Sequence, residues 1–191
     1  MAAFEHITTL LSFVFALALT HLLASATDLI LNRERVRFSW TQTIWMANAA
    51  ILLLINWLSL YGDKNLREWD ATTIGVQFLF TVLQYFTCSL VSPAMKEGET
   101  LDMGAFFERQ KLYALGAIAA LGVFAIAINA LFWSKLSNET AIHFIADQVV
   151  IGVLLVITIA AMVVRPKWLQ LVLAAVFTAG LLIPYFTTSL S

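Results

Sequence analysis

Six long apolar stretches limit the folds that this chain can adopt. A helix that crosses the hydrocarbon of a bilayer needs about 20 largely apolar residues, because each residue adds only about 1.5 Å of length. The stretches that meet this length are residues 7–31, 40–61, 72–93, 111–133, 143–164 and 168–189. Charged residues make up 12% of the chain, about half their share in a soluble domain. The sequence therefore predicts an all-α fold, a polytopic membrane bundle of six transmembrane helices in one domain over residues 1–191.

Basic residues predict how this bundle is oriented. The loops after the first, third and fifth stretches contain Arg33, Arg35, Arg37, Lys96, Arg109, Lys111, Arg165 and Lys167, and the other loops contain only Lys64, Arg67 and Lys135. Loops rich in lysine and arginine remain in the cytoplasm. We therefore expect both termini on the periplasmic side of a bacterial inner membrane, with Trp40, Tyr113 and Trp168 at the cytoplasmic boundary.

Composition and motifs argue against several classes of function. A net charge of -1 gives no reason to expect nucleic-acid binding. The single cysteine, Cys88, allows neither an intramolecular disulfide nor a cysteine-based metal site. The sequence also has no Gly-rich phosphate loop, G-x-S-x-G elbow or H-E-x-x-H motif. These observations favour a protein without enzymatic activity.

Polar residues within the first stretch are its most unusual feature. His21, Ser25 and Asp28 are separated by steps of four and three residues, which place them on one helix face. At about 1.5 Å per residue, His21 reaches a depth similar to that of Asn48 and Gln84. We expect His21 to face the interior, where the three side chains form one hydrogen-bonded layer. Such a layer either joins the helices or relays a proton or cation, with Ser25 and Asp28 at the cytoplasmic end of the path.

A second polar group is expected near the periplasmic side. The side chains that can line a vestibule there are Asn56, Gln77, Asn129, Asp147 and Gln148. A set of imidazoles and carboxylates at the same boundary suits a divalent metal ion, and it comprises Glu5, His6, Glu139, His143 and Asp147. Haem is another use for histidine, although it needs two imidazoles that face each other across the macrocycle. Metal or haem binding is thus an alternative, and the sequence requires no cofactor.

The fourth stretch is rich in small residues, among them Gly116, Ala120 and Gly122. Small residues let two helices approach closely in lipid. Gly116 and Ala120 lie on one strip of the helix, and Gly122 lies on another. These small-residue strips predict either a contact within the bundle or an interface between subunits, and we expect a homo-oligomer or a partner in a membrane complex. Before this stretch, Asp102 is placed to cap a helix.

The first part of the chain carries a resemblance to other proteins. It contains "LALTHLL" at 17–23, "RERVRFSW" at 33–40, and the tryptophans Trp45, Trp57 and Trp69. In these features it resembles a group of small bacterial inner-membrane proteins that open with an apolar G-L-x-L-T run, a basic loop and a Trp-rich second span. The glycine of that run is Ala16 here. The resemblance implies six spans and no particular activity.

The buried polar residues favour one function at this point, the conduction or transport of a small ion or proton through the bundle. Two alternatives remain open. One is a non-catalytic accessory subunit or scaffold of a membrane complex. The other is a metal- or haem-binding membrane redox protein.

Overall fold

A computed structural model describes residues 2–62, 71–96, 98–132 and 138–188, with side chains for residues 5–60, 71–96, 98–130, 145 and 148–183. Within these ranges the helices are α1 (Ala2–Leu31), α2 (Trp40–Gly62), α3 (Ala71–Val91), α4 (Met103–Phe132), α5 (Asn138–Val163) and α6 (Lys167–Thr188). The connections contain a 3-10 turn, η1 (Arg33–Arg35), and two short strands, β1 (Val36–Arg37) and β2 (Leu101–Asp102). The predicted all-helical class is confirmed.

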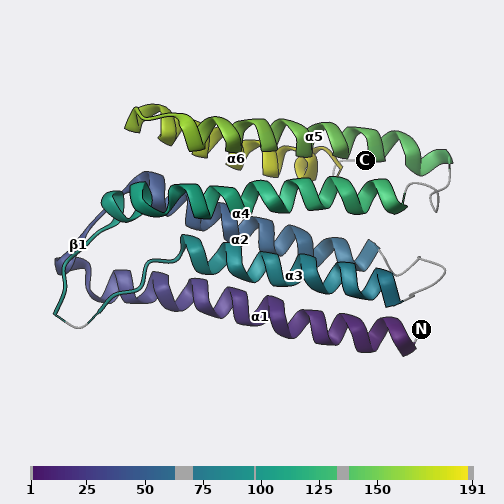
Figure 1. The fold of residues 1–191 in the computed structure, drawn as a ribbon, viewed down its shortest axis with the longest axis horizontal. Helices are drawn as coiled ribbons and strands as arrows, with labels where there is room; N and C mark the ends of the chain where they lie inside the picture. The colour runs from purple at the N-terminus through teal and green to yellow at the C-terminus, as the bar shows by residue number, and fades with distance from the viewer. Residues whose placement is uncertain (1, 63–70, 97, 133–137, 189–191) are drawn as a thin grey trace.

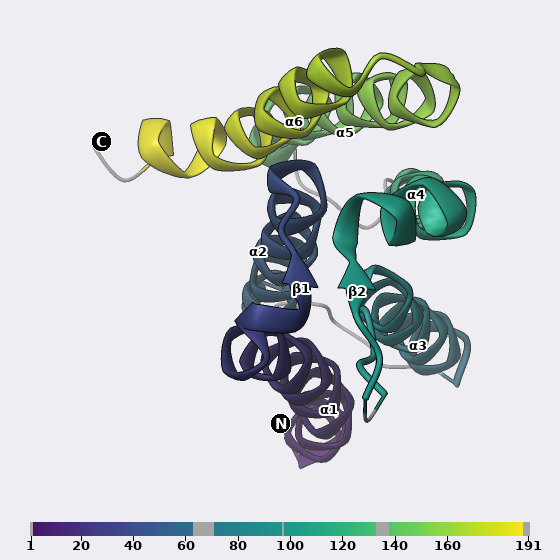
Figure 2. The same cartoon turned by 90° about the vertical axis from the view of Figure 1, so that its left-hand side faces the viewer.

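The helices lie lengthwise beside one another (Figure 1). Helix α3 packs between α1 and α4, α2 packs against α6, and α5 packs against both α4 and α6. Viewed end on, α1 lies at one edge and the α5–α6 pair at the other, with α2, α3 and α4 between them (Figure 2). The α1–α2, α3–α4 and α5–α6 connections all lie at one end of the bundle, the left-hand end in Figure 1.

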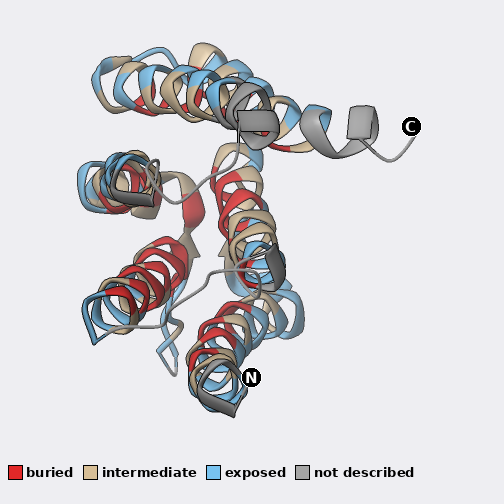
Figure 3. Cartoon of the chain, turned by 90° about the vertical axis from the view of Figure 1, so that its right-hand side faces the viewer, coloured by how far each residue is buried: buried red, intermediate tan, exposed pale blue. Residues whose placement is uncertain are grey.

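Helix α3 buries most of its polar side chains and exposes several of its large apolar ones. The buried face of α3 comprises Thr73, Gln77, Phe80, Thr81, Gln84, Thr87, Cys88 and Val91. On the same helix Phe78, Leu79 and Phe86 are exposed. Figure 3 shows that the buried faces of the helices point toward neighbouring helices, while the outward faces are exposed. An apolar exterior of this extent is unfavourable in water and is compatible with a lipid environment.

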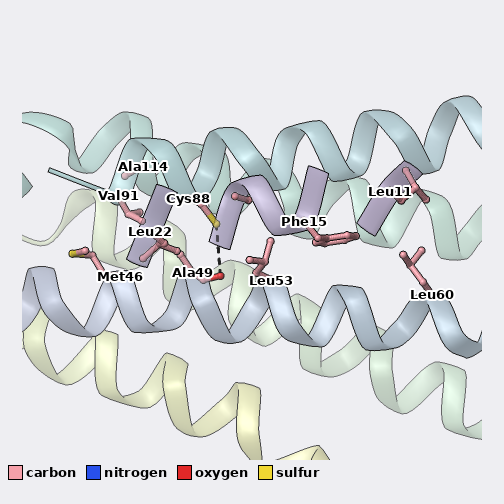
Figure 4. Packing of buried hydrophobic residues seen from close by; sticks show 11 residues of the cluster. Leu11, Phe15, Leu22, Met46, Ala49, Leu53, Leu60, Cys88, Val91 and Ala114 are labelled. Carbon is pink, nitrogen blue, oxygen red and sulfur yellow. Dashed lines mark hydrogen bonds between the residues drawn. The ribbon is translucent and has the colours of Figure 1, made fainter. Parts of the chain in front are cut away.

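Two apolar clusters fill the spaces between helices. The first joins α1, α2, α3 and α4 and includes Leu11, Phe15, Leu53, Cys88 and Ala114 (Figure 4). The second joins α2, α4, α5 and α6 around Trp45, Leu115 and Phe177. The ring centroids of Trp45 and Phe177 are 5.2 Å apart. Each of the two clusters includes residues of α2, which therefore links the two sides of the bundle.

Four helices contain segments long and apolar enough to cross a membrane. These segments are Glu5–Leu31, Trp40–Leu60, Ala71–Val91 and Met103–Ala130. The apolar segments described in the last two helices, Gln148–Val163 and Lys167–Ile183, are shorter. The structure thus supports a helical protein with four membrane-length apolar helices.

Helix α4 begins at Met103, well before the predicted start at residue 111. The reason is the side chain of Asp102, whose Oδ1 accepts a hydrogen bond from the backbone N–H of Ala105 at 2.9 Å. This bond satisfies one of the free N–H groups of the first helical turn. The predicted cap is confirmed, and the residues that follow it continue directly into the long helix.

Strands β1 and β2 join two connections at this end of the bundle. They pair in parallel, with Val36 opposite Leu101 and Arg37 opposite Asp102. The Nη1 atom of Arg37 lies 3.8 Å from Oδ2 of Asp102, and both side chains are exposed. An exposed ion pair contributes little, so the backbone pairing is the main link between the two connections.

The small residues of α4 lie partly against α5. A Cβ atom added to Gly122 would lie 3.7 Å from the side chain of Leu155, and one added to Gly116 would lie 3.9 Å from that of Met162. Ala120, by contrast, is exposed. Gly116 and Gly122 therefore belong to a contact within the bundle.

Gly180 of α6 lies directly against a side chain of α5. A Cβ atom there would lie 2.9 Å from Cδ2 of Leu154, a buried side chain. Both Gly180→Ala and Gly122→Ala gain the same helix propensity. Only Gly180→Ala overpacks against Leu154, so we expect it to be about 1 kcal/mol less stable than Gly122→Ala. Thermal unfolding in detergent measures the difference. Equal midpoints for the two variants would contradict the close approach.

The charge of Asp102 gives the helix cap a pH dependence. Hydrogen bonds from the backbone N–H of Ala105 and Gly104, together with the charges of Arg37 and Lys167, hold the pKa of the Asp102 carboxyl below its usual value. Its stabilising contribution is therefore present above the unfolded-state pKa and is lost as the pH falls through the folded-state pKa.

We expect Asp102→Ala to lower the unfolding midpoint at about pH 7, and its deficit to shrink at about pH 3. Asp102→Asn is the matched control, because asparagine caps helices about as well as aspartate without the charge. Midpoints measured at both pH values test this. A deficit of Asp102→Ala that does not change with pH would show that the charge plays no part.

Candidate functional site

Three buried polar side chains, Ser25, Gln42 and Gln170, donate to carbonyl groups at or just after the ends of two helices. Helix α3 ends at Val91, shortly before Pro93, and its last carbonyl groups have no intrahelical partner. The Nε2 atom of Gln42 donates to the carbonyl oxygen of Val91 at 2.5 Å. The hydroxyl of Ser25 donates to the carbonyl oxygen of Pro93 at 2.7 Å. Gln42 of α2 thus caps the end of α3, and Ser25 of α1 holds the segment that follows it.

Side chains of neighbouring helices also donate hydrogen bonds to the backbone at the end of α5. Its helix stops at Val163, and Pro166 follows in the short turn before α6. The carbonyl oxygen of Val164 accepts a hydrogen bond from Nε2 of Gln170 at 2.8 Å and one from Nζ of Lys111 at 3.5 Å. Lys111 also pairs with Glu108 at 2.9 Å. Side chains of α4 and α6 therefore hold the α5–α6 turn.

Asn48 connects α2 to α6. Its Nδ2 donates to the carbonyl oxygen of Ala174 at 3.1 Å, and its Oδ1 accepts a hydrogen bond from the hydroxyl of Thr178 at 2.7 Å. The side chain of Asn48 is fully buried. Both ends of the amide are satisfied, which is what the burial of a polar group requires.

Gln84 connects α3 to α2. Its Oε1 accepts a hydrogen bond from Nδ2 of Asn56 at 2.7 Å. Its Nε2 is buried and finds no oxygen or nitrogen acceptor among the described residues. The thiol of Cys88, which lies beside this amide, is a weak acceptor and itself points at the carbonyl oxygen of Ala49, 4.0 Å away (Figure 4).

The predicted layer of His21, Asn48 and Gln84 is wrong in its geometry. Asn48 bonds toward α6 and Gln84 toward Asn56. His21 is exposed on α1, with its ring centroid 6.4 Å from that of Tyr85. The buried face of α1 includes Leu22, and adjacent helix positions differ by about 100°. The three residues can therefore lie at the same depth while their side chains face different directions.

The remaining predicted site residues are dispersed. Gln77 is buried, Asn129 is half-buried, and Gln148 is half-buried with its Nε2 lacking a partner among the described residues. Asp28 is exposed and forms no ion pair with the described basic residues. The polar path from His21 through Ser25 to Asp28 is therefore not continuous inside the bundle, because only Ser25 is buried.

The predicted metal ligands have no common site among the side chains that the structure describes. Glu5 and His6 are exposed. The side chains of Glu139, His143 and Asp147 lie outside the described residues, so their part of the prediction stays a prediction. Among the residues that are described, no group of three or more His, Cys, Asp or Glu side chains could hold a metal ion.

Sequence reasoning missed the most important buried amides, Gln42 and Gln170. The signal for them was present as a short repeat: Arg-x-x-Trp-x-Gln occurs at residues 37–42 and again at 165–170. In both copies the tryptophan is exposed and the glutamine is 1% exposed. The same motif therefore spans the start of both α2 and α6, and its glutamine caps a neighbouring helix in each.

Comparisons of this chain with protein-family models, with curated proteins and with solved structures give no match. The resemblance of the first seventy residues to small inner-membrane proteins therefore stays a prediction.

The two glutamine caps should differ in importance. Gln42→Leu leaves the carbonyl of Val91 buried without a partner, and we expect a loss of about 1–3 kcal/mol in unfolding free energy. Gln170→Leu should cost less, because Lys111 also donates to the carbonyl oxygen of Val164. Unfolding in detergent provides the measurement.

Thr87→Val is the matched control for these two variants. The Thr87 hydroxyl donates a hydrogen bond to the carbonyl oxygen of Leu83, one turn earlier in its own helix. Removal of this hydroxyl therefore leaves no carbonyl at a helix end without a partner. An effect of Gln42→Leu no larger than that of Thr87→Val would show that the cap contributes little.

Proposed function

We propose that the chain is a polytopic integral membrane protein with six transmembrane helices. The observation that supports this is the inverted distribution of side chains, with Thr and Gln in the interior of α3 and Phe and Leu on its outside. Four helices already have the length and composition of membrane spans. The proposal extends this to α5 and α6, whose full helices run over 26 and 22 residues and reach about the length that a bilayer requires.

The proposed orientation places both termini in the periplasm of a bacterial inner membrane. The predicted cytoplasmic loops all lie at the same end of the bundle (Figure 1). In the described part of this end, Arg33, Arg35, Lys96, Arg165 and Lys167 are exposed. The excess of basic residues at one end supports a cytoplasmic location for that end.

Labelling of single cysteines tests this orientation. Cys88 is buried, so the wild-type chain in intact cells should react poorly with a membrane-impermeant maleimide. We expect Ala3→Cys to be labelled from outside, and Arg33→Cys to be labelled only after the membrane is permeabilised. The reverse pattern would invert the proposed topology.

For activity, we propose a non-catalytic accessory subunit or scaffold of a membrane complex. Among the described residues, none of the buried polar side chains is charged. Those polar side chains are Ser25, Gln42, Asn48, Thr73, Gln77, Thr81, Gln84, Thr87, Ser92, Thr158 and Gln170. Ser25, Gln42 and Asn48 donate to backbone carbonyls of other segments. Contacts of this kind hold helices in fixed positions and supply no proton carrier.

Transport of a small ion or proton is the second candidate. The observation that favours it is the buried Nε2 of Gln84, which lacks a strong acceptor on a helix face that also carries Gln77 and Thr81. An unpaired buried donor is costly, and a passing water or anion could serve as its acceptor. This candidate relies on Gln84 and Asn56 and gives His21 no role inside the bundle.

Flux measurements in proteoliposomes separate the two candidates. An accessory subunit should give no proton or ion flux above protein-free vesicles between about pH 5 and pH 8, the range in which histidine titrates. Flux that is abolished by Gln84→Leu and retained by His21→Ala would establish transport along α3 and overturn the accessory role. Thr87→Val again serves as the control for a buried polar change on the same helix.

The mass of the native assembly provides a positive test. The chain has a mass of 21.2 kDa. An accessory subunit extracted from its own membrane in mild detergent should appear in an assembly whose mass, after subtraction of bound lipid, is not a multiple of this value. A homo-oligomer would give a multiple of the chain mass and would contradict the accessory role.

A further inference from the structure

Helix α1 exposes polar side chains in a part of its apolar segment that lies far from either end. The segment runs from Glu5 to Leu31, and His21 lies about 15 Å from Leu31 at 1.5 Å per residue. His21 and the adjacent Thr20 are exposed. Apart from a ring contact with Tyr85, the imidazole has no hydrogen bond or ion pair among the described residues. In a bilayer, an ionisable side chain at this depth almost always faces protein or water, so lipid alone is an unfavourable environment for this face.

The exposed face of α5 shows how a surface of this chain that suits lipid is composed. Where the side chains of α5 are described, the exposed ones are all β-branched and apolar, namely Ile145, Val149, Val153, Val156, Ile159 and Val163. Helix α1 instead exposes a hydroxyl and an imidazole, at Thr20 and His21. Contact with hydrocarbon accounts for the first face and does not account for the second.

The outward face of α1 has a shape that another helix can fit. Four exposed residues follow one another in steps of four and so form one row along the helix: Ala16, Thr20, Ala24 and Asp28. Small side chains in such a row let a second helix approach closely in lipid. Because α1 lies at an edge of the bundle (Figure 2), no described residue of this chain covers the row. His21 borders the row, next to Thr20 in the chain.

Asp28 ends this row with a carboxylate that has no counter-charge. It is exposed and forms no ion pair among the described residues. A second copy of this chain, packed through the same face about a twofold axis, would place two Asp28 carboxylates at the same level, and like charges there oppose association. A helix of another protein supplies the opposite charge, because transmembrane helices carry lysine and arginine at their cytoplasmic ends. Charge complementarity therefore favours a different chain.

We propose that the outward face of α1, formed by Ala16, Thr20, His21, Ala24 and Asp28, binds a transmembrane helix of a different subunit. This helix lies along the row of small residues, offers a hydrogen-bond acceptor to the imidazole of His21, and carries a lysine or arginine at the level of Asp28. The inference rests on the proposed accessory role and names the surface through which the chain joins its complex.

Photo-cross-linking in the native membrane tests this surface. The photoreactive residue p-benzoylphenylalanine replaces Leu17, which is 61% exposed beside the row, or Val153, which is 54% exposed on α5 and serves as the matched control. We expect one discrete adduct from position 17, with the 21.2 kDa of the chain plus the mass of a different protein, and none from position 153. An adduct of twice the chain mass would place a second copy on this face and overturn the proposal. The absence of an adduct at position 17, or equal adducts at both positions, would also overturn it.

The chemistry of the partner is tested by the dependence of this adduct on two side chains. Asp28→Lys turns the proposed ion pair into a repulsion, and we expect the adduct yield to fall about tenfold. His21→Leu removes one hydrogen bond between helices, and we expect a fall of about threefold. Glu34→Lys makes the same change of charge on an exposed residue of η1 and should leave the yield unchanged. Full yield after either of the first two changes, or an equal loss with Glu34→Lys, would overturn the proposed partner. All three side chains are exposed, and gel filtration confirms that each variant remains folded.

Failure of this inference can be told apart from failure of the accessory role. A native assembly whose mass is a multiple of 21.2 kDa refutes the accessory role, and the inference fails with it. A native assembly that contains foreign subunits, while position 17 gives no adduct, refutes this inference alone, because the partner then contacts another face of the bundle.

Discussion

Backbone carbonyls at helix ends impose the constraint on which this structure depends. A helix always leaves its last carbonyl groups unpaired, and in an apolar environment no water replaces the missing donors. Here the ends of α3 and α5 lie against other helices, and each receives a side-chain donor from a helix that starts nearby. Gln42 supplies one donor and Gln170 the other. The positions of α2 and α6 relative to their neighbours follow from these contacts.

This constraint explains why the buried polar groups are amides and hydroxyls. A neutral amide can donate to a carbonyl at little desolvation cost, whereas a buried charge needs a compensating partner. Ser25, Asn48 and Gln170 all donate to carbonyl oxygens outside their own helical turn. The polar interior is thus largely accounted for by the needs of the backbone. The exceptions among the described residues are Nε1 of Trp45 and Nε2 of Gln84 and Gln148, which find no acceptor there.

Much of the helical architecture could be predicted from the sequence, because helix length and apolar composition are properties of single segments. The start of α4 was missed because residues 103–110 are too polar to count as part of a span, although the cap at Asp102 was visible. The candidate site was harder. Depth along a helix follows from counting residues, but direction around the helix depends on which neighbours pack against it. His21 and Gln84 match in depth and point to different surroundings.

The pairing of β1 with β2 has a consequence for how the chain is assembled. Val36 and Leu101 are neighbours in the finished protein, yet more than sixty residues of chain must be synthesised between them. Until the second strand leaves the ribosome, the first has no partner, and α1, α2 and α3 must stay together through their side-chain contacts alone. The β1–β2 pairing therefore forms late, when the residues just before α4 have been synthesised. The order of translation thereby sets the order in which the bundle becomes fixed.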